Sequence, residues 1–212
     1  MLVGYRMTKD PITVFPDLPV TEALEKMRQN KVHHFPVLNR KGKLVGIVSH
    51  SDLLYAAPSS ATSLNVWEVT YLLNRIQVRE VMTKDVITVD EDCPIEDAAR
   101  LMREHSIGGL PVMRDEAVVG IITESDLFQV FLELLKAQET GVRLTALAPN
   151  VKGSLAKISS AISESGGLIH SLNAYVAEDP AHWGFVVKAA DISKDELLKA
   201  VEPLVVKVLD VR

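Results

Sequence analysis

Apolar and polar positions before residue 130 repeat in two blocks of the same design. Each block contains apolar residues at the i, i+3, i+4, i+7 spacing of an amphipathic helix, starting at Val20 in the first block and at Ile95 in the second. A short apolar run, a polar turn and another apolar run follow, and they predict two strands joined by a turn. A second helix begins near Ser51 in the first block. Each block therefore predicts helix, strand, strand, helix, with a short strand in front.

The two blocks are copies of one sequence. Residues 7–14 (MTKDPITV) recur as residues 82–89 (MTKDVITV), an offset of 75, and residues 45–53 match residues 119–127 at an offset of 74. This similarity indicates an internal duplication. One copy alone would expose a face of its sheet, so we expect the two copies to pack face to face about a pseudo-twofold axis.

Between and after the copies the pattern changes. Residues 58–63 are small and polar and predict a flexible stretch, and residues 64–76 predict a mostly helical connector. From Val142 onward, strands and helices follow in the order βαββαβ, which predicts a ferredoxin-like sandwich. The fold class of the whole chain is therefore α+β. The predicted parts are residues 1–57 (first copy), 58–76 (connector), 77–136 (second copy) and 142–212 (C-terminal domain).

Composition and charge remove several classes of function. The chain is 47% hydrophobic and 24% charged, as ordinary globular proteins are. A net charge of -5 offers no basic face for nucleic acid or for an anionic membrane. No apolar run is long enough to span a bilayer, and residues 1–20 lack the apolar core of a signal peptide, so we expect a cytoplasmic protein. Cys93 is the single cysteine and has no partner within the chain for a disulfide.

The side chains that catalysis needs do not form a set that can be recognised. An enzyme requires a nucleophile with a base, a pair of carboxylates or a metal cluster. His33 and His34 are adjacent rather than one helical turn apart, and the other four of the six histidines have no regular ligand spacing. We therefore expect no catalytic residue, no metal site and no catalytic cofactor.

Three spaced elements recur in order in both copies. They are an Ile-Thr-Val strand, a hydrophobic-Pro-Val strand and a closing Gly-hydrophobic-x-Ser/Thr-x-x-Asp sequence. By these elements each copy resembles a CBS motif, and the tandem pair resembles a Bateman module over residues 7–130. With its tail, the order of the whole chain is similar to that of the acetoin-utilisation (AcuB-type) CBS-ACT proteins. The resemblance implies a pair of motifs that binds an adenine nucleotide.

The closing sequence has a chemical logic of its own. A carboxylate can accept hydrogen bonds from both hydroxyls of a ribose, and a hydroxyl at a helix N-terminus suits a phosphate. Asp52 with Ser49, and Asp126 with Thr123, fall at the start of a helix in each copy. The alternative is that these residues only cap the helix. Capping accounts less well for the same spacing in both copies, which favours nucleotide binding.

The resemblance implies two composite sites, in which the Asp of one copy faces an adenine pocket from the other copy. One site would join Ile12, Val32 and His33 to Asp126, Thr123 and Ile121, and the other would join Ile87, Ile107 and Gly108 to Asp52, Ser49 and Ile47. The predicted nucleotide-binding residues are Ile12, Val32, His33, His34, Phe35, Pro36, Ile47, Ser49, Asp52, Ile87, Ile107, Gly108, Gly109, Leu110, Pro111, Ile121, Thr123 and Asp126.

The two sites are expected to differ at one pair of positions. The first copy has His33 and His34 where the second has Gly108 and Gly109. In the family, basic residues there reach phosphates, which implies that the Asp52 site, with the imidazoles, prefers the phosphorylated ligand. The alternative is that the two histidines only precede a strand. Since neighbours in an extended chain point opposite ways, only one of them can face the site.

The C-terminal residues resemble an ACT domain. The resemblance rests on the element order, on Asn150-x-x-Gly153-x-Leu155 at a strand-to-helix loop and on the pair Gly166-Gly167. In that family this loop binds amino acids at a dimer interface, which implies an amino-acid site at Asn150, Gly153 and Leu155. Lys152 stands where many members have Pro, a departure that puts the site in doubt. The alternative is a purely dimerising domain.

Together these patterns predict a non-catalytic ligand sensor. We expect a homodimer in which adenine-nucleotide occupancy (AMP, ADP or ATP class) and amino-acid occupancy change the dimer conformation or a partner metabolic enzyme. The alternative is an interaction protein with empty pockets that holds a partner through the apolar helix after Leu127. The sequence does not choose the ligand among AMP, ADP, ATP, S-adenosylmethionine and NAD.

Overall fold

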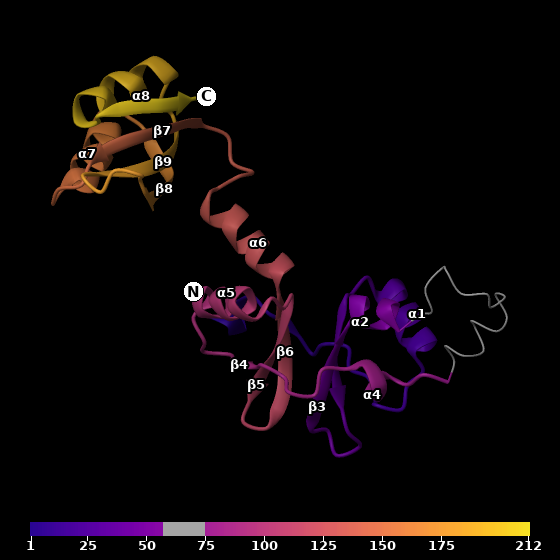
Figure 1. Cartoon of the computed structure of the whole chain (residues 1–212). Helices are drawn as coiled ribbons and strands as arrows, with labels where there is room; N and C mark the ends of the chain where they lie inside the picture. Colours follow the sequence, from indigo (N-terminus) through magenta and orange to yellow (C-terminus); the bar gives the residue numbers. More distant parts are fainter. Residues whose placement is uncertain (57–74) are drawn as a thin grey trace. The chain divides into compact units, whose positions relative to one another are not determined.

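The computed structural model describes residues 1–56 and 75–212, and the chain divides into two compact units, Met1–Leu127 and Phe128–Arg212 (Figure 1). The stretch predicted as flexible and almost all of the predicted connector lie outside the described residues. Among the helices of the described part, none combines the length and the apolar character that crossing a bilayer requires.

The two copies of the repeat have the same elements. The first copy contains α1 (Val20–Asn30), β2 (His34–Leu38), β3 (Leu44–Ser49) and α2 (His50–Tyr55). The second contains α5 (Ile95–His105), β5 (Gly109–Arg114), β6 (Ala117–Thr123) and α6 (Glu124–Leu134), which runs past the end of the first unit. The predicted order of helix, strand, strand and helix is confirmed in both copies.

The first helix of each copy shows why the repeat folds alike twice. Val20, Ala23 and Met27 of α1 are buried on one face, as the i, i+3, i+7 spacing predicts, and α5 buries the equivalent residues. Each helix ends at a residue in the left-handed conformation, Lys31 after α1 and Ser106 after α5, both with φ 54°. The turn after each helix then leads into the central strand of its copy.

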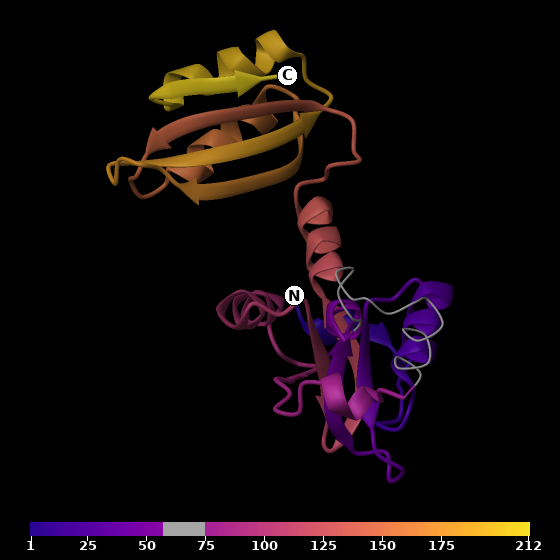
Figure 2. The ribbon, with the colours of Figure 1, turned by 45° about the vertical axis from the view of Figure 1, so that its right-hand side comes forward.

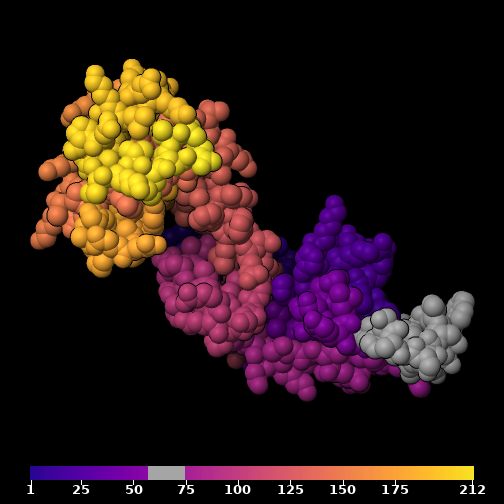
Figure 3. Space-filling model, turned by 45° about the horizontal axis from the view of Figure 1, so that its top comes forward, coloured from indigo at the N-terminus to yellow at the C-terminus, as the bar shows by residue number. Residues whose placement is uncertain are grey.

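The segment that leads each copy pairs with the hairpin of the other copy. The chain begins with η1 (Val3–Tyr5) and β1 (Thr8–Lys9), and β1 pairs antiparallel with β6. In the second copy, α4 (Val78–Val81) precedes Thr83, which bridges Ile47 of β3. In Figure 3 the magenta atoms of residues after 75 lie against the purple atoms of the first copy. The two copies are therefore interlocked through their leading segments.

Each copy is predicted to begin with a short strand, and the structure shows which copy that strand pairs with. The strand divides: Val14 forms a parallel bridge with Val37 of its own copy, as β4 (Val89–Asp90) does with β5, whereas residues 8–9 join the other copy. Gly46 and Gly120 make the exchange possible, because a Cβ at either would collide with the sulfur of a methionine, Met82 and Met7 respectively. The sequence shows the equivalence of the segments but not which copy each one contacts.

Each copy has a hydrophobic core that contains a residue from the leading segment of the other. The core of the first copy includes Phe35, Leu53 and Val78, all fully buried. The core of the second includes Leu110 and Val3, also fully buried. Removing fully buried side chains from water is worth about 1.5–3 kcal/mol each, so the exchanged residues stabilise the pair of copies as one body.

The second unit is a four-stranded antiparallel sheet with two helices on one face (Figure 2). The strands stand in the order β10-β7-β9-β8, and the element order is βαββαβ as the sequence predicts. The last strand begins at Lys207, after a short 3-10 turn, η2 (Glu202–Leu204), that contains Pro203. The other elements are β7 (Val142–Pro149), α7 (Ser154–Glu164), β8 (Leu168–Val176), β9 (His182–Ala190), α8 (Lys194–Val201) and β10 (Lys207–Val211).

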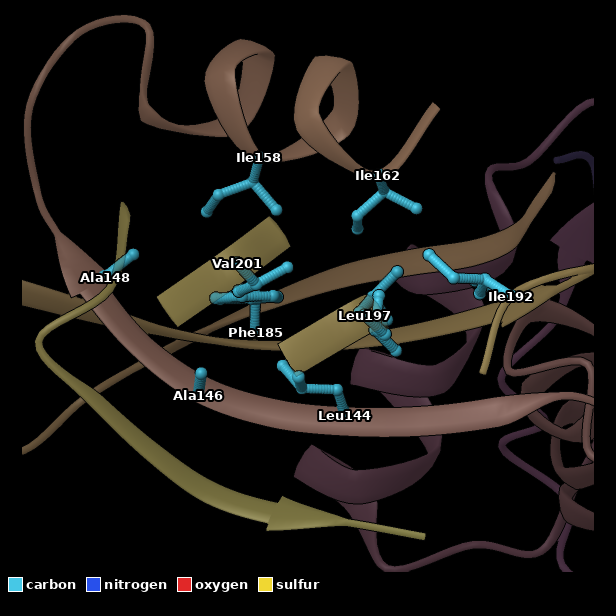
Figure 4. Close-up of a cluster of buried hydrophobic side chains, with 11 residues drawn as sticks. Leu144, Ala146, Ala148, Ile158, Ile162, Phe185, Ile192, Leu197 and Val201 are labelled. Carbon is cyan, nitrogen blue, oxygen red and sulfur yellow. The ribbon is translucent and has the colours of Figure 1, made fainter. Parts of the chain in front are cut away.

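Alternation along the strands of the second unit builds one core. Leu144 and Phe185 point from the sheet toward the helices, where Ile158 and Ile162 of α7 meet them (Figure 4). Leu197 from α8 closes the same core. The other face of β7 carries the side chains of the alternate positions, Arg143, Thr145, Leu147 and Pro149. The ferredoxin-like order predicted from the sequence is present, and the ACT assignment of this unit is a separate question of function.

Candidate ligand site

Two cavities open between the copies within the first unit, and they are named here after Ser49 and Thr123, which occupy equivalent positions. The Ser49 pocket has a volume of about 590 Å³ and the Thr123 pocket about 470 Å³, both in the range of small-molecule sites. The Ser49 pocket is lined by His34, Ile47, Ser49, Ser51, Asp52, Thr83, Asp85, Val86, Ile87, His105, Ser106, Ile107, Gly108, Gly109 and Glu124. The Thr123 pocket is lined by Thr8, Asp10, Pro11, Ile12, Lys31, Val32, His33, His34, Gly108, Ile121, Thr123, Glu124 and Ser125.

Both pockets are composite. In the Ser49 pocket, Ser49 and Asp52 of the first copy face Ile87 and Ile107 of the second. In the Thr123 pocket the arrangement is reversed, since Thr123 and Ile121 come from the second copy and the opposite wall from the first, including Ile12 and Val32. The structure thus brings together the residues that the resemblance implied for each site, except Asp126, which is not among the residues that line the Thr123 pocket.

The Ser49–Asp52 pair forms a capping box at the start of α2. Both the backbone N–H and the hydroxyl of Ser49 donate to Oδ2 of Asp52 at 2.7 Å, and the N–H of Asp52 donates to the Ser49 hydroxyl at 3.2 Å. All the bonds to the carboxylate end on Oδ2. The capping alternative is therefore real, and it holds the carboxylate in place while Oδ1 makes no hydrogen bond within the described residues.

Thr123 and Asp126 repeat this geometry at the start of α6. The N–H of Thr123 donates to Oδ2 of Asp126 at 2.8 Å, and its hydroxyl donates to the same oxygen at 2.6 Å. Asp126 itself is not among the residues that line the Thr123 pocket, whereas Asp52 lines the Ser49 pocket. Asp126 fixes the orientation of Thr123, which does line its pocket.

Besides Asp126, four of the predicted site residues lie outside both linings. Phe35 and Leu110 are fully buried in the cores of the first and second copy. Pro36 and Pro111 are buried in β2 and β5, next to those residues. The prediction for these four followed the continuity of the sequence motif, whereas alternation along a strand turns Phe35 and Leu110 into the hydrophobic core.

The two neighbouring histidines go to different places. His34 lines both pockets, and its ring lies against Gly108 and Gly109, where an added Cβ would come within 3.3 Å of the ring. His33 is exposed, lines the Thr123 pocket and packs edge-on against the ring of His50 at 5.7 Å. His33 lies with Thr123 and Ile121, as the composite-site prediction had it, whereas the prediction that placed both imidazoles at the Asp52 site does not agree with the linings.

Burial sets the protonation of His34. Its pKa is lowered, first by burial and then by the nearby His33, while the carboxylates of Asp52 and Glu124 act in the opposite direction. A lowered pKa leaves this imidazole neutral near pH 7. In that form it offers one N–H donor and one acceptor to the two pockets rather than a positive charge.

Several lining residues escaped the sequence reasoning. Lys31 and Asp10 line the Thr123 pocket, and Asp85 and Ser106 line the Ser49 pocket. The repeat holds the signal that could have found them, because Asp10 and Asp85, and likewise Lys31 and Ser106, are equivalent positions of the two copies. Glu124 lines both pockets. Across the described residues, no group of three or more His, Cys, Asp or Glu side chains is placed to hold a metal ion.

The predicted amino-acid site in the second unit lies on the loop between β7 and α7. The side-chain amide of Asn150 donates to the carbonyl of Pro180 at 3.1 Å, so it ties this loop to the turn before β9. Gly153 precedes α7 with φ 86°, a conformation that favours glycine, and Leu155 is exposed. The structure brings these three residues to one end of the sheet.

Comparison with known proteins identifies the first unit. The family model described as "CBS domain" matches residues 3–59 and 78–133, which is more than half of the chain. A CBS domain-containing protein of Dictyostelium discoideum is 31% identical over 137 residues, covering 64% of this chain and 94% of that protein.

Two solved structures are similar over the same region. A putative acetoin utilization protein (AcuB) from Vibrio cholerae has a TM-score of 0.54 and 33% identity, covering 65% of this chain and 95% of that one. The CBS domain pair of protein MJ0100, solved in complex with 5′-methylthioadenosine and S-adenosyl-L-methionine, has a TM-score of 0.53 and 30% identity, covering 66% and 98%.

Proposed function

Because the chain belongs to the CBS domain family, we propose that its two interlocked copies form a non-catalytic regulatory module that binds adenosine-containing ligands between them. One observation carries the proposal. Each of two composite pockets lies beside a Ser/Thr–Asp pair at the start of a helix, Ser49 with Asp52 and Thr123 with Asp126. The apolar walls suit an adenine ring, and the polar pair suits its ribose.

The oxygen of Asp52 that the cap leaves free is the expected ribose contact in the Ser49 pocket, and in the Thr123 pocket the equivalent Asp126 orients Thr123. In Asp52 and Asp126 alike, Oδ2 is held by the N–H and hydroxyl of the residue three positions before. Oδ1 of Asp52 therefore keeps its acceptor capacity for a ribose hydroxyl, and its direction is fixed by the cap. Capping and ligand binding are then two uses of one carboxylate rather than competing explanations.

The class of ligand is an adenosine compound, and we place AMP, ADP and ATP among the candidates. The similar CBS domain pair of protein MJ0100 was solved in complex with two adenosine compounds, 5′-methylthioadenosine and S-adenosyl-L-methionine. This similarity supports an adenosine compound as the ligand of the present chain. We further propose that the protein is a homodimer and that occupancy biases either the dimer or a partner enzyme. An amino acid at Asn150, Gly153 and Leu155 of an ACT-type second unit belongs to the same proposal.

A thermal-shift screen of the whole chain tests this function. Adenosine, AMP, ATP and S-adenosylmethionine are added to the purified protein, with the corresponding guanine nucleotides as controls. A ligand at a hundred times its Kd raises the unfolding free energy by about 2.7 kcal/mol, which appears as a higher melting temperature. Stabilisation by adenine but not guanine compounds is expected. Absence of any shift at millimolar ligand would contradict the proposal.

A second candidate function is that of an interaction protein whose pockets stay empty. The helices α2 and α6 expose apolar side chains at equivalent positions, Leu54 at 51% and Phe128 at 65% exposure, and Tyr55 and Phe131 extend these surfaces. Exposed apolar side chains gathered on a helix are typical of a protein contact. Light scattering of the wild type and of Leu54→Asp separates the cases, since a scaffold would change its assembly in this variant while no adenosine compound stabilises it.

A further inference from the structure

The two pockets are built from equivalent positions of the repeat, so each serves as an internal control for the other. Thr8, Asp10 and Ile12 of the Thr123 pocket correspond to Thr83, Asp85 and Ile87 of the Ser49 pocket. The helix starts correspond as well, and each contains one capping Asp. Charges at these shared positions therefore cannot make the pockets differ.

The pockets do differ at the turn after the first helix of each copy. Lys31 and His33 line the Thr123 pocket, and their equivalents, Ser106 and Gly108, line the Ser49 pocket. Lys31 is exposed and makes no ion pair or side-chain hydrogen bond with the described residues, so its ammonium group is available to a ligand. This exchange adds one full positive charge and one imidazole to the Thr123 pocket.

The Ser49 pocket lacks such a charge. Both pockets contain carboxylates, Asp52, Asp85 and Glu124 in the Ser49 pocket and Asp10 and Glu124 in the Thr123 pocket, but no Lys or Arg is among the residues that line the Ser49 pocket. Its only basic side chains are the imidazoles of His34 and His105. A phosphate placed there would meet carboxylates without a compensating ammonium or guanidinium group, and like charges at short range repel.

The helices at the two pockets also differ in length. α6 has 11 residues, and Glu124 and Ser125 of its first turn line the Thr123 pocket together with Thr123, which precedes the helix. α2 has six residues in its described extent. The partial positive charge of a helix N-terminus attracts anions, and the longer helix presents the more complete dipole. Helix length and Lys31 therefore favour an anion in the same pocket.

We infer that the two pockets divide adenosine ligands by charge. The Thr123 pocket takes adenosine that carries phosphates, with Lys31 and His33 at the phosphates. The Ser49 pocket takes adenosine compounds without phosphate, neutral or cationic at the 5′ position, because no ammonium group offsets its carboxylates, which repel a phosphate and attract a cation. This inference rests on the proposed function, and it reverses the sequence-based expectation that the Asp52 site holds the phosphorylated ligand.

Exchanging the residues at the two equivalent turn positions tests the inference. Lys31 and Ser106 have the same φ of 54° and both are exposed, so Lys31→Ser and Ser106→Lys change charge with little effect on folding. Calorimetry on the whole chain with ATP and with adenosine gives affinity and stoichiometry. Lys31→Ser should weaken the binding of ATP by about three- to tenfold, which is the effect expected from losing one partly exposed charge-assisted contact. The affinity for adenosine should be unchanged. Ser106→Lys should create a second ATP site.

Each other outcome has a defined meaning. If Lys31→Ser lowers the affinities for ATP and for adenosine equally, the inference is overturned, because Lys31 would then support the shape of the pocket and would not contact the phosphates. Two ATP sites in the wild type, or adenosine binding at only one site, would overturn the division between the pockets. If neither ATP, adenosine nor S-adenosylmethionine binds the wild type, the proposed function itself fails. Salt gives a further readout, since ATP affinity should fall with ionic strength and adenosine affinity should not.

Discussion

The first and second copies of the repeat place one backbone around two pockets, yet Lys31 and His33 stand in one pocket where Ser106 and Gly108 stand in the other. The buried positions of the copies have changed much less: Ala23 and Met27 of α1 match Ala98 and Met102 of α5. Packing restricts substitution inside the cores, whereas an exposed turn at the edge of a cavity is free to change. Differences between the copies are therefore most informative where they face a ligand.

The largest expected effect comes from breaking the interlocked cores. Phe35→Ala removes a fully buried ring and should cost about 3–5 kcal/mol of unfolding free energy. Val78, from the second copy, lies in the same core as Phe35, whereas its equivalent Val3 lies in the core of Leu110. Combining Phe35→Ala with Val78→Ala should therefore be non-additive by about 0.5–3 kcal/mol, as measured by urea unfolding.

The matched control for this cycle is Phe35→Ala with Val3→Ala. Those residues belong to different cores, so their effects should add within about 0.5 kcal/mol. Coupling of Phe35 to Val3 instead of Val78 would show that each leading segment packs on its own copy in solution.

A smaller effect should separate the two capping carboxylates. Asp126→Ala removes the carboxylate that holds Thr123 at the edge of the pocket, and losing a charge-assisted hydrogen bond costs about 1.5–3 kcal/mol, so ATP should bind roughly ten- to a hundredfold more weakly. Asp52→Ala should have this effect on adenosine in the Ser49 pocket and little effect on ATP. Calorimetry of both variants with both ligands provides the measurement.

The corresponding Asn variants provide the control, because an amide keeps one oxygen for the cap. A larger loss of ATP in Asp52→Ala than in Asp126→Ala would assign the phosphorylated ligand to the Ser49 pocket, as the sequence hypothesis had it.

Much of the fold could be predicted because each pattern of apolar and polar residues occurs twice in the sequence, once in each copy. The helix of α5 shows the same apolar spacing as α1, and the strands around Pro36 and Pro111 share one pattern. What the sequence could not show is the exchange of leading segments. Pairing Thr8 with Ile121 or with Ile47 satisfies the same backbone hydrogen bonds, and only the folded pair decides between them.

The candidate site was only partly predictable for a related reason. The motif identifies Ser49, Asp52 and their equivalents, but it does not show where their side chains point. His33 and His34 were treated as one feature, and a strand sends neighbouring side chains to different sides. Lys31 was missed because it lies in a turn outside the motif, where its role depends on the cavity that the other copy completes.

The second unit should respond less strongly than the first to the loss of one polar side chain. The amide of Asn150 makes one exposed hydrogen bond, to Pro180, and losing a neutral hydrogen bond costs about 0.5–1.5 kcal/mol. Asn150→Ala should lower stability by that amount and leave adenosine affinity unchanged. If the loop binds an amino acid, stabilisation of the wild type by amino acids should disappear in this variant. A change in adenosine affinity would instead couple the two units.

The smallest expected effect is a pH dependence that the second copy lacks, because Gly109 stands at the position equivalent to His34. Burial lowers the pKa of His34, so below the ordinary histidine value near 6.5 the unfolded chain binds a proton more readily than the folded one. Its contribution to stability is complete above pH 6.5 and is lost as the pH falls through the lowered pKa. Unfolding free energies from pH 5 to pH 7.5 should therefore rise more steeply in the wild type than in His34→Gln. Equal slopes would mean that His34 titrates alike in both states and that the ring is solvated where it meets Gly108 and Gly109.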